Sequence, residues 1–479
     1  MHYKLHDEIG LRGWDGSPYA LRHFPSGRTE FVGEDFFQAL SFCDGGFDCD
    51  SPLLTPLHRQ LIGFAVKKGA AVPCEEGSGL AERQKYRLHP CKYISTAHWS
   101  ITGKCNMRCR HCYMSAPQAK YGEISTQKAL EIVNQIAAAG IAKVNLTGGE
   151  PLVRSDFWEI VDALRERDIV IEQVYTNGLL VNEALLGEFE RRGMRPEFSL
   201  SFDGVGWHDW LRGYEGAEKD TVRAIKLLRS RNFPVGIESA FHRDSIGAIG
   251  DTMRLLGELG VSSWKTNPAA GSGNWLNESR DLDLAKDELY DAYLKLIPEY
   301  FAAGSPLSVQ LGGFFSCEKG GREYIFPSKK PYTDEEKRLR EPLCGAARNM
   351  MYISADVRLL PCMPLAGLPV QDEYPSLHGS TIAEALNSSI YLERISAPIS
   401  ELFGKNDECA ACEHRLPCNG GCRSAALSEN NGADYFGKDS WTCHFFKGGY
   451  EERIKEVCKE YEERTKEACK EAAPAMPTR

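Results

Sequence analysis

The sequence lacks any long apolar run and any excess of positive charge. No stretch reaches the roughly 18 apolar residues that a membrane-spanning helix needs. Residues 1–8 carry charges where a secretory signal would have an apolar core. We therefore expect a cytoplasmic protein with no membrane partner. The formal net charge of -10 and the pI near 5.8 argue against a broad phosphate-binding surface, so we expect no nucleic acid partner either.

Cysteine, in contrast, is abundant at 17 residues, and its spacing decides how it is interpreted. In a reducing compartment, thiols are typical of metal ligands or buried side chains rather than of disulfides. Residues 1–90 hold no clustered cysteine motif. We interpret the scattered cysteines there, and the one that follows, as unpaired thiols: Cys43, Cys49, Cys74 and Cys91.

The first of about three domains expected from 479 residues is predicted to be a small binding module. A Ser-Gly turn joins residues 19–24 and 28–32 into a predicted hairpin, and helical patterns follow at residues 34–42 and 54–67. Two strands followed by helices are typical of a winged-helix-like module. We therefore expect residues 1–90 to bind a partner rather than to catalyse.

Residues 91–305 alternate short apolar strands with amphipathic helices. The predicted strands lie at residues 94–100, 143–147, 169–175, 198–202, 234–241 and 262–266. The predicted helices lie at residues 125–138, 182–191, 219–230, 246–259 and 285–301, with one more that begins at Ser155 as its N-cap. Six such repeats predict an α/β fold with a parallel sheet, closed or partly closed, as in a partial (β/α)6 barrel.

After residue 305 the repeat is lost, and glycine, proline and cysteine become frequent up to residue 449. Loops in residues 306–449 must be held by something other than a large apolar core. Residues 450–479 comprise a highly charged helix candidate with Cys458 and Cys469, followed by a proline-containing tail. We expect this last helix to be solvated.

Three cysteines follow the first predicted strand of the repeat at spacings of four and three: Cys105, Cys109 and Cys112. A cubane iron-sulfur cluster needs thiolates that reach separate irons, and a short loop supplies them without long-range closure entropy. Three ligands leave one iron open to a substrate or cosubstrate, whereas a structural zinc site needs four ligands. A zinc site completed by His111 is the alternative, and the position at the mouth of a β/α domain favours the reactive site.

The run CNMRCRHCY at residues 105–113 resembles the CxxxCxxC motif of radical S-adenosylmethionine (SAM) enzymes. The resemblance implies a 4Fe-4S cluster whose open iron is chelated by the amino and carboxylate groups of SAM. An electron from the cluster then splits SAM into methionine and a 5'-deoxyadenosyl radical, which abstracts a hydrogen from the substrate. The three cysteines are accordingly the predicted catalytic residues.

Further strand ends match the same family in order. The TGGEP run at residues 147–151 follows the second strand, where glycines let the backbone approach a ligand closely and Glu150 can accept from an ammonium. The runs YTNG at 175–178 and SLSFDG at 199–204 resemble the strand ends that contact ribose and carboxylate. The predicted cofactor-binding residues are Thr147, Gly148, Gly149, Glu150, Asn177, Ser199, Ser201 and Arg212, with Glu238 and Asn267 as further candidates. A helix cap and a surface charge are the alternatives for Ser201 and Arg212.

A second set of cysteines lies in the C-terminal part: Cys344, Cys362, Cys409, Cys412, Cys418, Cys422 and Cys443. Seven cysteines exceed the number that one cluster or one zinc ion can bind, so we expect two sites. On spacing alone, two zinc sites are the alternative to two clusters.

The CxxCx5CxxxC run within this set resembles the SPASM domain of peptide-modifying radical SAM enzymes. The resemblance implies two auxiliary 4Fe-4S clusters, and thus three clusters in all. It assigns Cys409, Cys412, Cys418 and Cys443 to one auxiliary cluster, and Cys344, Cys362 and Cys422 to the other. Val357 stands where the family usually has glycine, and Cys317 is the candidate for the missing fourth ligand; a substrate thiolate on the open iron is the alternative.

The combined resemblance implies a maturase of ribosomally made peptides. We expect hydrogen abstraction from a residue of a precursor peptide, followed by formation of a thioether or a carbon-carbon cross-link. The N-terminal module looks like the leader-recognition element of such enzymes, to which a leader adds a strand. The expected reductant is a flavodoxin or ferredoxin. Formylglycine formation in a sulfatase, peptide epimerisation and a non-catalytic zinc-binding interaction protein are the alternatives.

Overall fold

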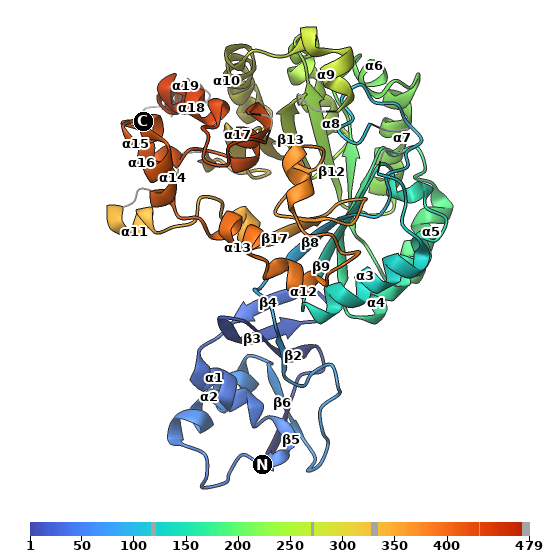
Figure 1. Ribbon diagram of the computed structural model, residues 1–479, viewed down its shortest axis with the longest axis vertical. Coiled ribbons are helices and arrows are strands. Elements are labelled where there is room, and N and C mark those ends of the chain that lie inside the picture. Colours follow the sequence, from blue (N-terminus) through green and yellow to red (C-terminus); the bar gives the residue numbers. More distant parts are fainter. Residues whose placement is uncertain (116–120, 270–272, 327–333, 431, 472–479) are drawn as a thin grey trace, which may run out of the picture.

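The computed structural model describes residues 1–115, 121–269, 273–326, 334–430 and 432–471. Residues 1–90, drawn in blue in Figure 1, form a lobe below the central α/β part of the molecule. The C-terminal residues, drawn in orange and red, lie beside the central part.

The central part is built on the six predicted strands, which the structure confirms. They are β8 (Thr96–Ser100), β9 (Lys143–Thr147), β10 (Val170–Thr176), β11 (Glu197–Ser201), β12 (Val235–Phe241) and β13 (Ser263–Pro268). Each strand in this series pairs in parallel with the next one. Their residues are largely buried, as expected for a parallel sheet covered on both faces.

The sheet continues beyond the predicted repeat at both ends. At one end β14 (Ser308–Leu311) pairs in parallel with β13 and leads to two antiparallel strands, β15 (Phe315–Cys317) and β16 (Tyr324–Ile325). At the other end β17 (Met350–Ile353) pairs in parallel with β8, followed by β18 (Leu359–Leu360). Strands from the C-terminal part therefore belong to the same eleven-stranded sheet as β8 to β13, without a break near residue 305.

Helices cover this sheet and confirm the predicted α-helices. They are α3 (Thr126–Ala138), α4 (Phe157–Glu166), α5 (Glu183–Arg191), α7 (Ala217–Ser230), α8 (Ile249–Glu258) and α10 (Lys286–Ala302), with two short helices, α6 (His208–Arg212) and α9 (Asn274–Glu278). The start of α4 differs from the prediction. Asp156, not Ser155, is the N-cap residue, and its carboxylate is held by the Arg154 guanidinium at 2.6 and 2.8 Å. Among the described helices, none is both long and apolar enough to cross a membrane.

The N-terminal module contains the predicted hairpin, β3 (Ser17–His23) and β4 (Arg28–Phe31), and the predicted helices, α1 (Glu34–Ser41) and α2 (Pro56–Lys67). It also has five strands that the sequence did not indicate. They are β1 (His2–Leu5), β2 (Ile9–Trp14), β5 (Asp44–Asp48), β6 (Ala71–Cys74) and β7 (Arg87–His89). The module is therefore a mixed α/β unit with two sheets, ordered β5-β1-β6 and β4-β3-β2-β7.

The C-terminal part consists of short helices and loops. The helices are α11 (Glu335–Leu339), α12 (Ile382–Leu386), α13 (Ser389–Ser396), α14 (Ile399–Lys405), α15 (Asp407–Ala410), α16 (Arg415–Cys418), α17 (Arg423–Glu429) and α18 (Ser440–Lys447). The last helix, α19 (Tyr450–Glu471), differs from the expected solvated helix because its first half packs on α10. Tyr450, Ile454 and Cys458 recur every four residues and are buried, and the Tyr461 hydroxyl donates to the Phe301 carbonyl at 2.9 Å. Cys469 lies on the part of α19 whose side chains the structure does not describe.

Candidate active site at the strand ends

The three cysteines of the CNMRCRHCY run lie together on the loop after β8. Cys109 is buried against Met107 and Ala217, with the half-buried Cys105 and Cys112 packed on the same small cluster. Burial raises the pKa of the Cys105 thiol, the neighbouring Cys109 and Cys112 contribute, and the resulting pKa is about 12. The thiols are thus close enough to influence one another. Since a metal binds the thiolate, loading this site must release protons.

The two glycines of the TGGEP run hold the cysteine loop at its start. A side chain on Gly149 would lie 2.2 Å from the Lys104 carbonyl oxygen, and one on Gly148 would lie 2.5 Å from that of Thr102. The Gly149 and Glu150 amides donate to the same two carbonyls at 2.8 and 2.9 Å. The sequence predicted that these glycines admit a ligand. The structure shows that they admit the backbone that leads into Cys105.

Glu150 is buried at the centre of this strand-end cluster. Its carboxylate accepts from the Thr176 hydroxyl at 2.9 Å, the Asn177 amide at 2.8 Å and the Leu152 amide at 3.1 Å. Burial raises its pKa to about 7, although these bonds favour the charged form. The Asn177 side chain in turn donates to Asn106 Oδ1 at 2.7 Å, which ties the third strand end to the cysteine loop.

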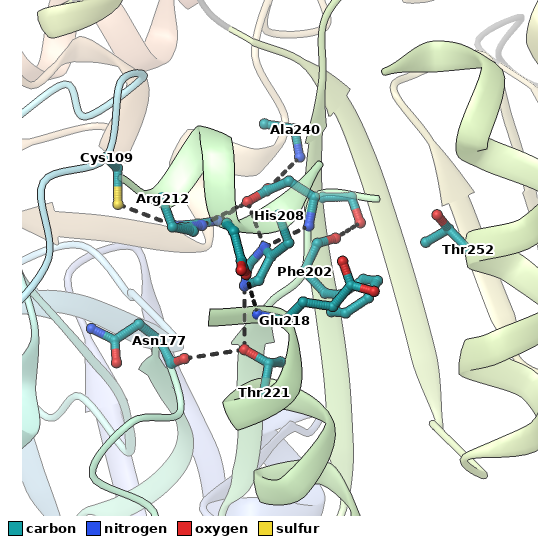
Figure 2. Close-up of polar contacts among 12 residues, drawn as sticks. Cys109, Asn177, Phe202, His208, Arg212, Glu218, Thr221, Ala240 and Thr252 are labelled. Atoms are coloured by element: carbon teal, nitrogen blue, oxygen red, sulfur yellow. Dashed lines mark hydrogen bonds and ion pairs between the residues drawn. The ribbon is translucent and has the colours of Figure 1, made fainter. Parts of the chain in front are cut away.

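Arg212 lies between the cysteine loop and Asp203, as Figure 2 shows for its contact with Cys109. Its Nε and Nη2 donate to the Asp203 carboxylate at 2.6 and 3.0 Å, and its Nη1 lies 3.7 Å from Cys109 Sγ. Burial would raise the pKa of Asp203, but Arg212 and His208 together hold it far below its usual value. The side chains of Arg212 and Asp203 are both buried. The Arg212 guanidinium is therefore already hydrogen-bonded within the protein, to the Asp203 carboxylate and to the Cys109 thiol.

His208 extends this network back to the third strand end (Figure 2). Its Nδ1 lies 3.0 Å from Asp203 Oδ2 and its Nε2 3.2 Å from Thr221 Oγ1, which is 3.5 Å from the Asn177 carbonyl. Sequence reasoning placed Asp203 at a strand end but missed its pairing with His208 and Arg212. The i, i+4 spacing of His208 and Arg212 is the signal that would have put both side chains on one face of a helix.

The remaining predicted cofactor contacts occupy successive strands. Thr147 ends β9 and Ser199 lies within β11, and both are buried. Ser201 ends β11 half-buried and is in register with Glu238 on β12. Glu238 lies 3.6 Å from the Lys265 ammonium, and Asn267 lies two residues further along β13. The strand ends therefore bring these side chains to one edge of the sheet.

The C-terminal cysteines lie in two places in the structure. Cys409, Cys412, Cys418 and Cys443 line one pocket, together with charged residues that include Glu408, Lys438 and Lys447. Burial raises the pKa of the Cys418 thiol to about 12, and Cys409 and Cys443 contribute. The short helices α15, α16 and α18 carry Cys409, Cys418 and Cys443, and Cys412 lies in the turn between α15 and α16.

Cys344, Cys362 and Cys422 form the other group. Burial raises the pKa of the Cys362 thiol far above its usual value, and Cys422 and Cys344 contribute. The Ser424 hydroxyl lies 3.0 Å from Cys422 Sγ and is also hydrogen-bonded to Cys362. Cys317 lies on β15, where its thiol donates to the Glu318 and Gly321 carbonyls at 3.7 and 3.6 Å. The structure thus gives Cys317 carbonyl partners of its own.

Val357, at the position usual for glycine, adopts the conformation of a glycine. Its φ is 57° and its side chain is fully buried. A β-branched residue with positive φ is strained, by about 1–3 kcal/mol. The loop between β17 and β18 therefore has a left-handed residue at position 357 although this residue is not glycine.

Replacing Val357 with glycine is expected to destabilise the protein less than removing an ordinary buried valine. The variant Val357→Gly loses buried apolar surface, but it also removes the backbone strain of a valine with positive φ. Val144 in β9 is also fully buried, and Val144→Gly loses apolar surface without removing any such strain. We expect Val357→Gly to cost about 1–3 kcal/mol less in urea unfolding than Val144→Gly. Equal losses would contradict the strained conformation.

Unsatisfied polar atoms lie beside each cysteine group. Within the described residues, the buried atoms without a hydrogen-bond partner include His111 Nδ1 next to Cys112, both polar side-chain atoms of Asn419 next to Cys418, and the Tyr374 and Tyr391 hydroxyls. No three His, Cys, Asp or Glu side chains in the described part converge closely enough to hold a single ion. A cubane takes each thiolate on a separate iron, so such convergence is not required of it. The donor set, ten thiols in three groups, fits iron-sulfur clusters.

The N-terminal cysteines have other surroundings. Cys43 and Cys49 are buried in the apolar core of the module, and Cys91 is buried in the main core. Burial raises the pKa of the Cys43 thiol to about 12, and this thiol donates to the Ala39 carbonyl at 3.7 Å. Cys74, on β6, is half-buried. That these four are unpaired thiols rather than ligands stays a prediction.

Comparison with known proteins identifies a radical SAM domain in this chain. Residues 99–256 match the radical SAM superfamily, and this range contains the cysteine triplet, the TGGEP run and Arg212. The PqqA peptide cyclase of Gluconobacter oxydans is 25% identical over 338 residues, which cover 68% of this chain and 85% of the cyclase. The AdoMet-dependent heme synthase of Methanosarcina barkeri is 24% identical over 355 residues, which cover 69% of this chain and 91% of the synthase.

A solved structure matches a larger part of the chain. SuiB of Streptococcus suis bound to precursor peptide SuiA has a TM-score of 0.59 at 12% identity, covering 92% of this chain and 99% of SuiB. SuiB bound to S-adenosylmethionine has a TM-score of 0.57 at 13% identity with the same coverage. At these identities the likeness concerns the fold. The radical SAM domain implies a 4Fe-4S cluster and SAM. On the match of residues 99–256 and the similarity to the PqqA peptide cyclase, this chain is an enzyme that carries a radical SAM domain.

Proposed function

We propose that this enzyme modifies a residue of a ribosomally made precursor peptide, and that the product carries a thioether or a carbon-carbon cross-link. The likeness to SuiB, solved in complex with a precursor peptide, supports the proposal most directly. At most 8% of this chain lies outside that match, whereas residues 1–90 make up about a fifth of the 479. Much of the N-terminal module therefore has a counterpart in a protein that binds such a peptide.

In this proposal Cys105, Cys109 and Cys112 hold the catalytic cluster. When bound, the cluster and SAM supply a 5'-deoxyadenosyl radical that abstracts a hydrogen from the substrate. Arg212 fixes the part of the cysteine loop that carries Cys109, through its contact with Cys109 Sγ. Asn177 holds the other side of the loop through Asn106.

SAM is proposed to lie along the strand ends. Glu150, in the TGGEP turn, is the proposed partner of the SAM ammonium, and a nearby cation would lower the raised pKa of its carboxyl. Ser201 is the proposed partner of the SAM carboxylate, because Arg212 is already committed to Asp203. Thr147, Asn177 and Ser199 complete the proposed cofactor contacts, from the same edge of the sheet.

Two auxiliary clusters are proposed in the C-terminal part. Cys409, Cys412, Cys418 and Cys443 line a common cavity, which supports one of them. The mutual influence of Cys344, Cys362 and Cys422 supports the other. Both clusters are proposed to relay electrons, with a flavodoxin or ferredoxin as the reductant. Cys317 remains the proposed fourth ligand of the cluster at Cys344.

The N-terminal module is proposed to bind the leader of the peptide. Four of its strands, β4, β5, β6 and β7, are each paired with one other strand among the described residues, so each offers a backbone edge. Strand addition to such an edge needs backbone hydrogen bonds and little side-chain specificity. A leader of varied sequence can be recognised in this way.

The product of a short open reading frame next to the gene, incubated anaerobically with enzyme, reductant and SAM, tests this function. We expect the peptide to lose two hydrogens per cross-link, and a leaderless form of the same peptide to react much more slowly. Unchanged mass with uptake of deuterium from solvent would indicate epimerisation instead. Unchanged mass without deuterium, from a peptide that binds, would refute peptide modification.

Heme synthesis is the second candidate, because the heme synthase of Methanosarcina barkeri is nearly as similar in sequence as the peptide cyclase. That likeness covers 69% of this chain and 91% of the synthase, so about a third of this chain lies beyond it. Conversion of a porphyrin substrate under the same anaerobic conditions, with no change in the peptide, would favour this candidate.

A further inference from the structure

The short helix α6 is fastened to the cysteine loop through its backbone. The Leu211 carbonyl accepts from the Arg110 amide of the loop at 2.9 Å. Gly213, which ends α6 with a φ of 60°, packs on the Arg108 carbonyl oxygen, and a β-carbon at this position would lie only 2.6 Å from that oxygen. The last turn of α6 therefore has a fixed place against the loop that carries Cys109.

Arg212, the last residue of α6, directs one nitrogen of its guanidinium at Cys109. Its Nε and Nη2 donate to the Asp203 carboxylate at 2.6 and 3.0 Å, and its Nη1 donates to Cys109 Sγ at 3.7 Å (Figure 2). A guanidinium is planar, so a carboxylate that binds two of its nitrogens also fixes the direction of the third. Arg212 and Cys109 are both buried, so little solvent screens the positive charge from the sulfur.

Asp203 is held in place by more than its bonds to Arg212. Its Oδ1 also accepts from the Ala240 amide of β12 at 2.9 Å, and its Oδ2 lies 3.0 Å from His208 Nδ1 (Figure 2). Arg212 and His208 keep the pKa of this fully buried carboxyl far below its usual value, so Asp203 is charged at neutral pH. A buried cation therefore contacts the Cys109 sulfur, and a buried anion lies on the other side of that cation.

We propose that Arg212 and Asp203 set the reduction potential of the catalytic cluster: the guanidinium, hydrogen-bonded to the Cys109 sulfur, raises this potential, and the carboxylate limits the rise. The inference rests on the proposed function, which places the catalytic cluster on Cys109 and its two neighbouring cysteines. Reduction adds negative charge to the cluster, so a nearby cation stabilises the reduced form and a nearby anion destabilises it. Arg212 and Asp203 are positioning residues, because they act on the cluster through the Cys109 sulfur.

Redox titration of the reconstituted full-length protein, followed by electron paramagnetic resonance, tests the proposal. The signal of the catalytic cluster is the one that changes when SAM is added and that disappears when Cys105, Cys109 and Cys112 are replaced with alanine. At a fixed potential and neutral pH, Arg212→Met should lower the ratio of reduced to oxidised catalytic cluster at least tenfold, which corresponds to 59 mV for a one-electron couple. Asp203→Asn should raise this ratio several-fold, because it leaves the Arg212 charge without its counter-ion. The potentials of the auxiliary clusters should not change in either variant.

Two further variants separate the effect of charge from a loss of stability. Arg212→Lys keeps the positive charge but lacks the planar fork, so it should recover part of the potential that Arg212→Met loses. Arg192→Met is the matched control, since the Arg192 side chain is only 8% exposed and donates to Asp162 at 2.7 and 2.9 Å at the end of α5. The control should destabilise the protein without changing the potential of the catalytic cluster.

The direction of each shift decides the outcome. Shifts of the same sign in Arg212→Met and Asp203→Asn, or an equal shift in Arg192→Met, would overturn the proposal. If the triple alanine variant keeps the signal that responds to SAM, the catalytic cluster and this inference fail together. If that signal is lost while the Arg212 and Asp203 variants keep the original potential, this inference alone fails. Should Arg212→Met not fold, the opposite shifts expected of Arg212→Lys and Asp203→Asn still test it.

Discussion

Replacing Cys105, Cys109 and Cys112 together with alanine should abolish the formation of 5'-deoxyadenosine. The three thiols lie on one loop and are the proposed ligands of the catalytic cluster. The variant should retain the clusters of the C-terminal part, so it should bind about four fewer iron atoms per chain. Chromatography of the reaction products and iron analysis of the anaerobically reconstituted protein measure the two effects.

The variant Cys74→Ala is the matched control for this experiment. Cys74 is half-buried on β6 of the N-terminal module, far along the chain from the strand ends. It should keep its full iron content and its rate of SAM cleavage. If the triple variant still formed 5'-deoxyadenosine, the assignment of the catalytic cluster would be wrong.

Replacing Arg212 with methionine should lower the free energy of unfolding by about 3–5 kcal/mol at neutral pH, because it leaves a buried carboxylate without its counter-ion. Asp203 is fully buried and accepts two hydrogen bonds from Arg212. Urea unfolding of the metal-free protein measures the loss. The double variant Asp203→Asn with Arg212→Met should be more stable than Arg212→Met alone, since no charge is then left unpaired.

An exposed ion pair provides the matched control. Arg254 lies 3.2 Å from Glu299, and both side chains are about half exposed. Since solvent screens such a pair, Arg254→Met should cost no more than about 1 kcal/mol. Similar losses for Arg212→Met and Arg254→Met would show that burial does not strengthen the pair at Asp203.

The effect of Arg212→Met should also depend on pH. Arg212 and His208 hold the pKa of Asp203 far below that of an unfolded aspartate, against the effect of burial. The stabilisation is therefore complete above the unfolded pKa of about 3.9 and is lost as the pH falls towards the folded value. In the variant, burial without the counter-ion should raise the pKa of Asp203 above that of an unfolded aspartate, so the difference from the unaltered protein should shrink as the pH falls from 7 to 3. A difference that stayed constant from pH 7 to pH 3 would contradict a charged Asp203.

Local patterns in the sequence predicted much of the central fold. Period-2 and period-3.6 patterns placed the six strands β8 to β13 and the helices between them within two residues of their ends in most cases. Patterns of this kind report which face of an element is buried, which depends on neighbouring residues. They failed for β14 and β17, whose short runs gain their places through pairing with β13 and β8. They also missed five strands of the N-terminal module, which are short and rich in glycine and charge.

Two of the cysteine groups could also be predicted from the sequence, because short spacings bring thiols together without help from distant parts of the chain. The groups at Cys105 and at Cys409 are of this kind. Cys344 and Cys422 are separated by many residues, and their association with Cys362 came from the family resemblance. The hydrogen-bond partners of individual polar side chains could not be predicted from the sequence. Arg212 was expected to meet the carboxylate of SAM, and the folded chain pairs it with Asp203 and Cys109.

The sequence by itself determined that thiols gather on two short runs, residues 105–112 and 409–422, and that the chain has a repeated β/α domain, since spacing and periodicity are local properties. Only the tertiary structure decided which residues act on those thiols. Gly149 packs against Lys104, Arg212 is held between Asp203 and Cys109, and the Asn177 side chain donates to Asn106. Each of these contacts joins segments that are distant in the chain, and such contacts form only when the packing of the whole domain brings the segments together.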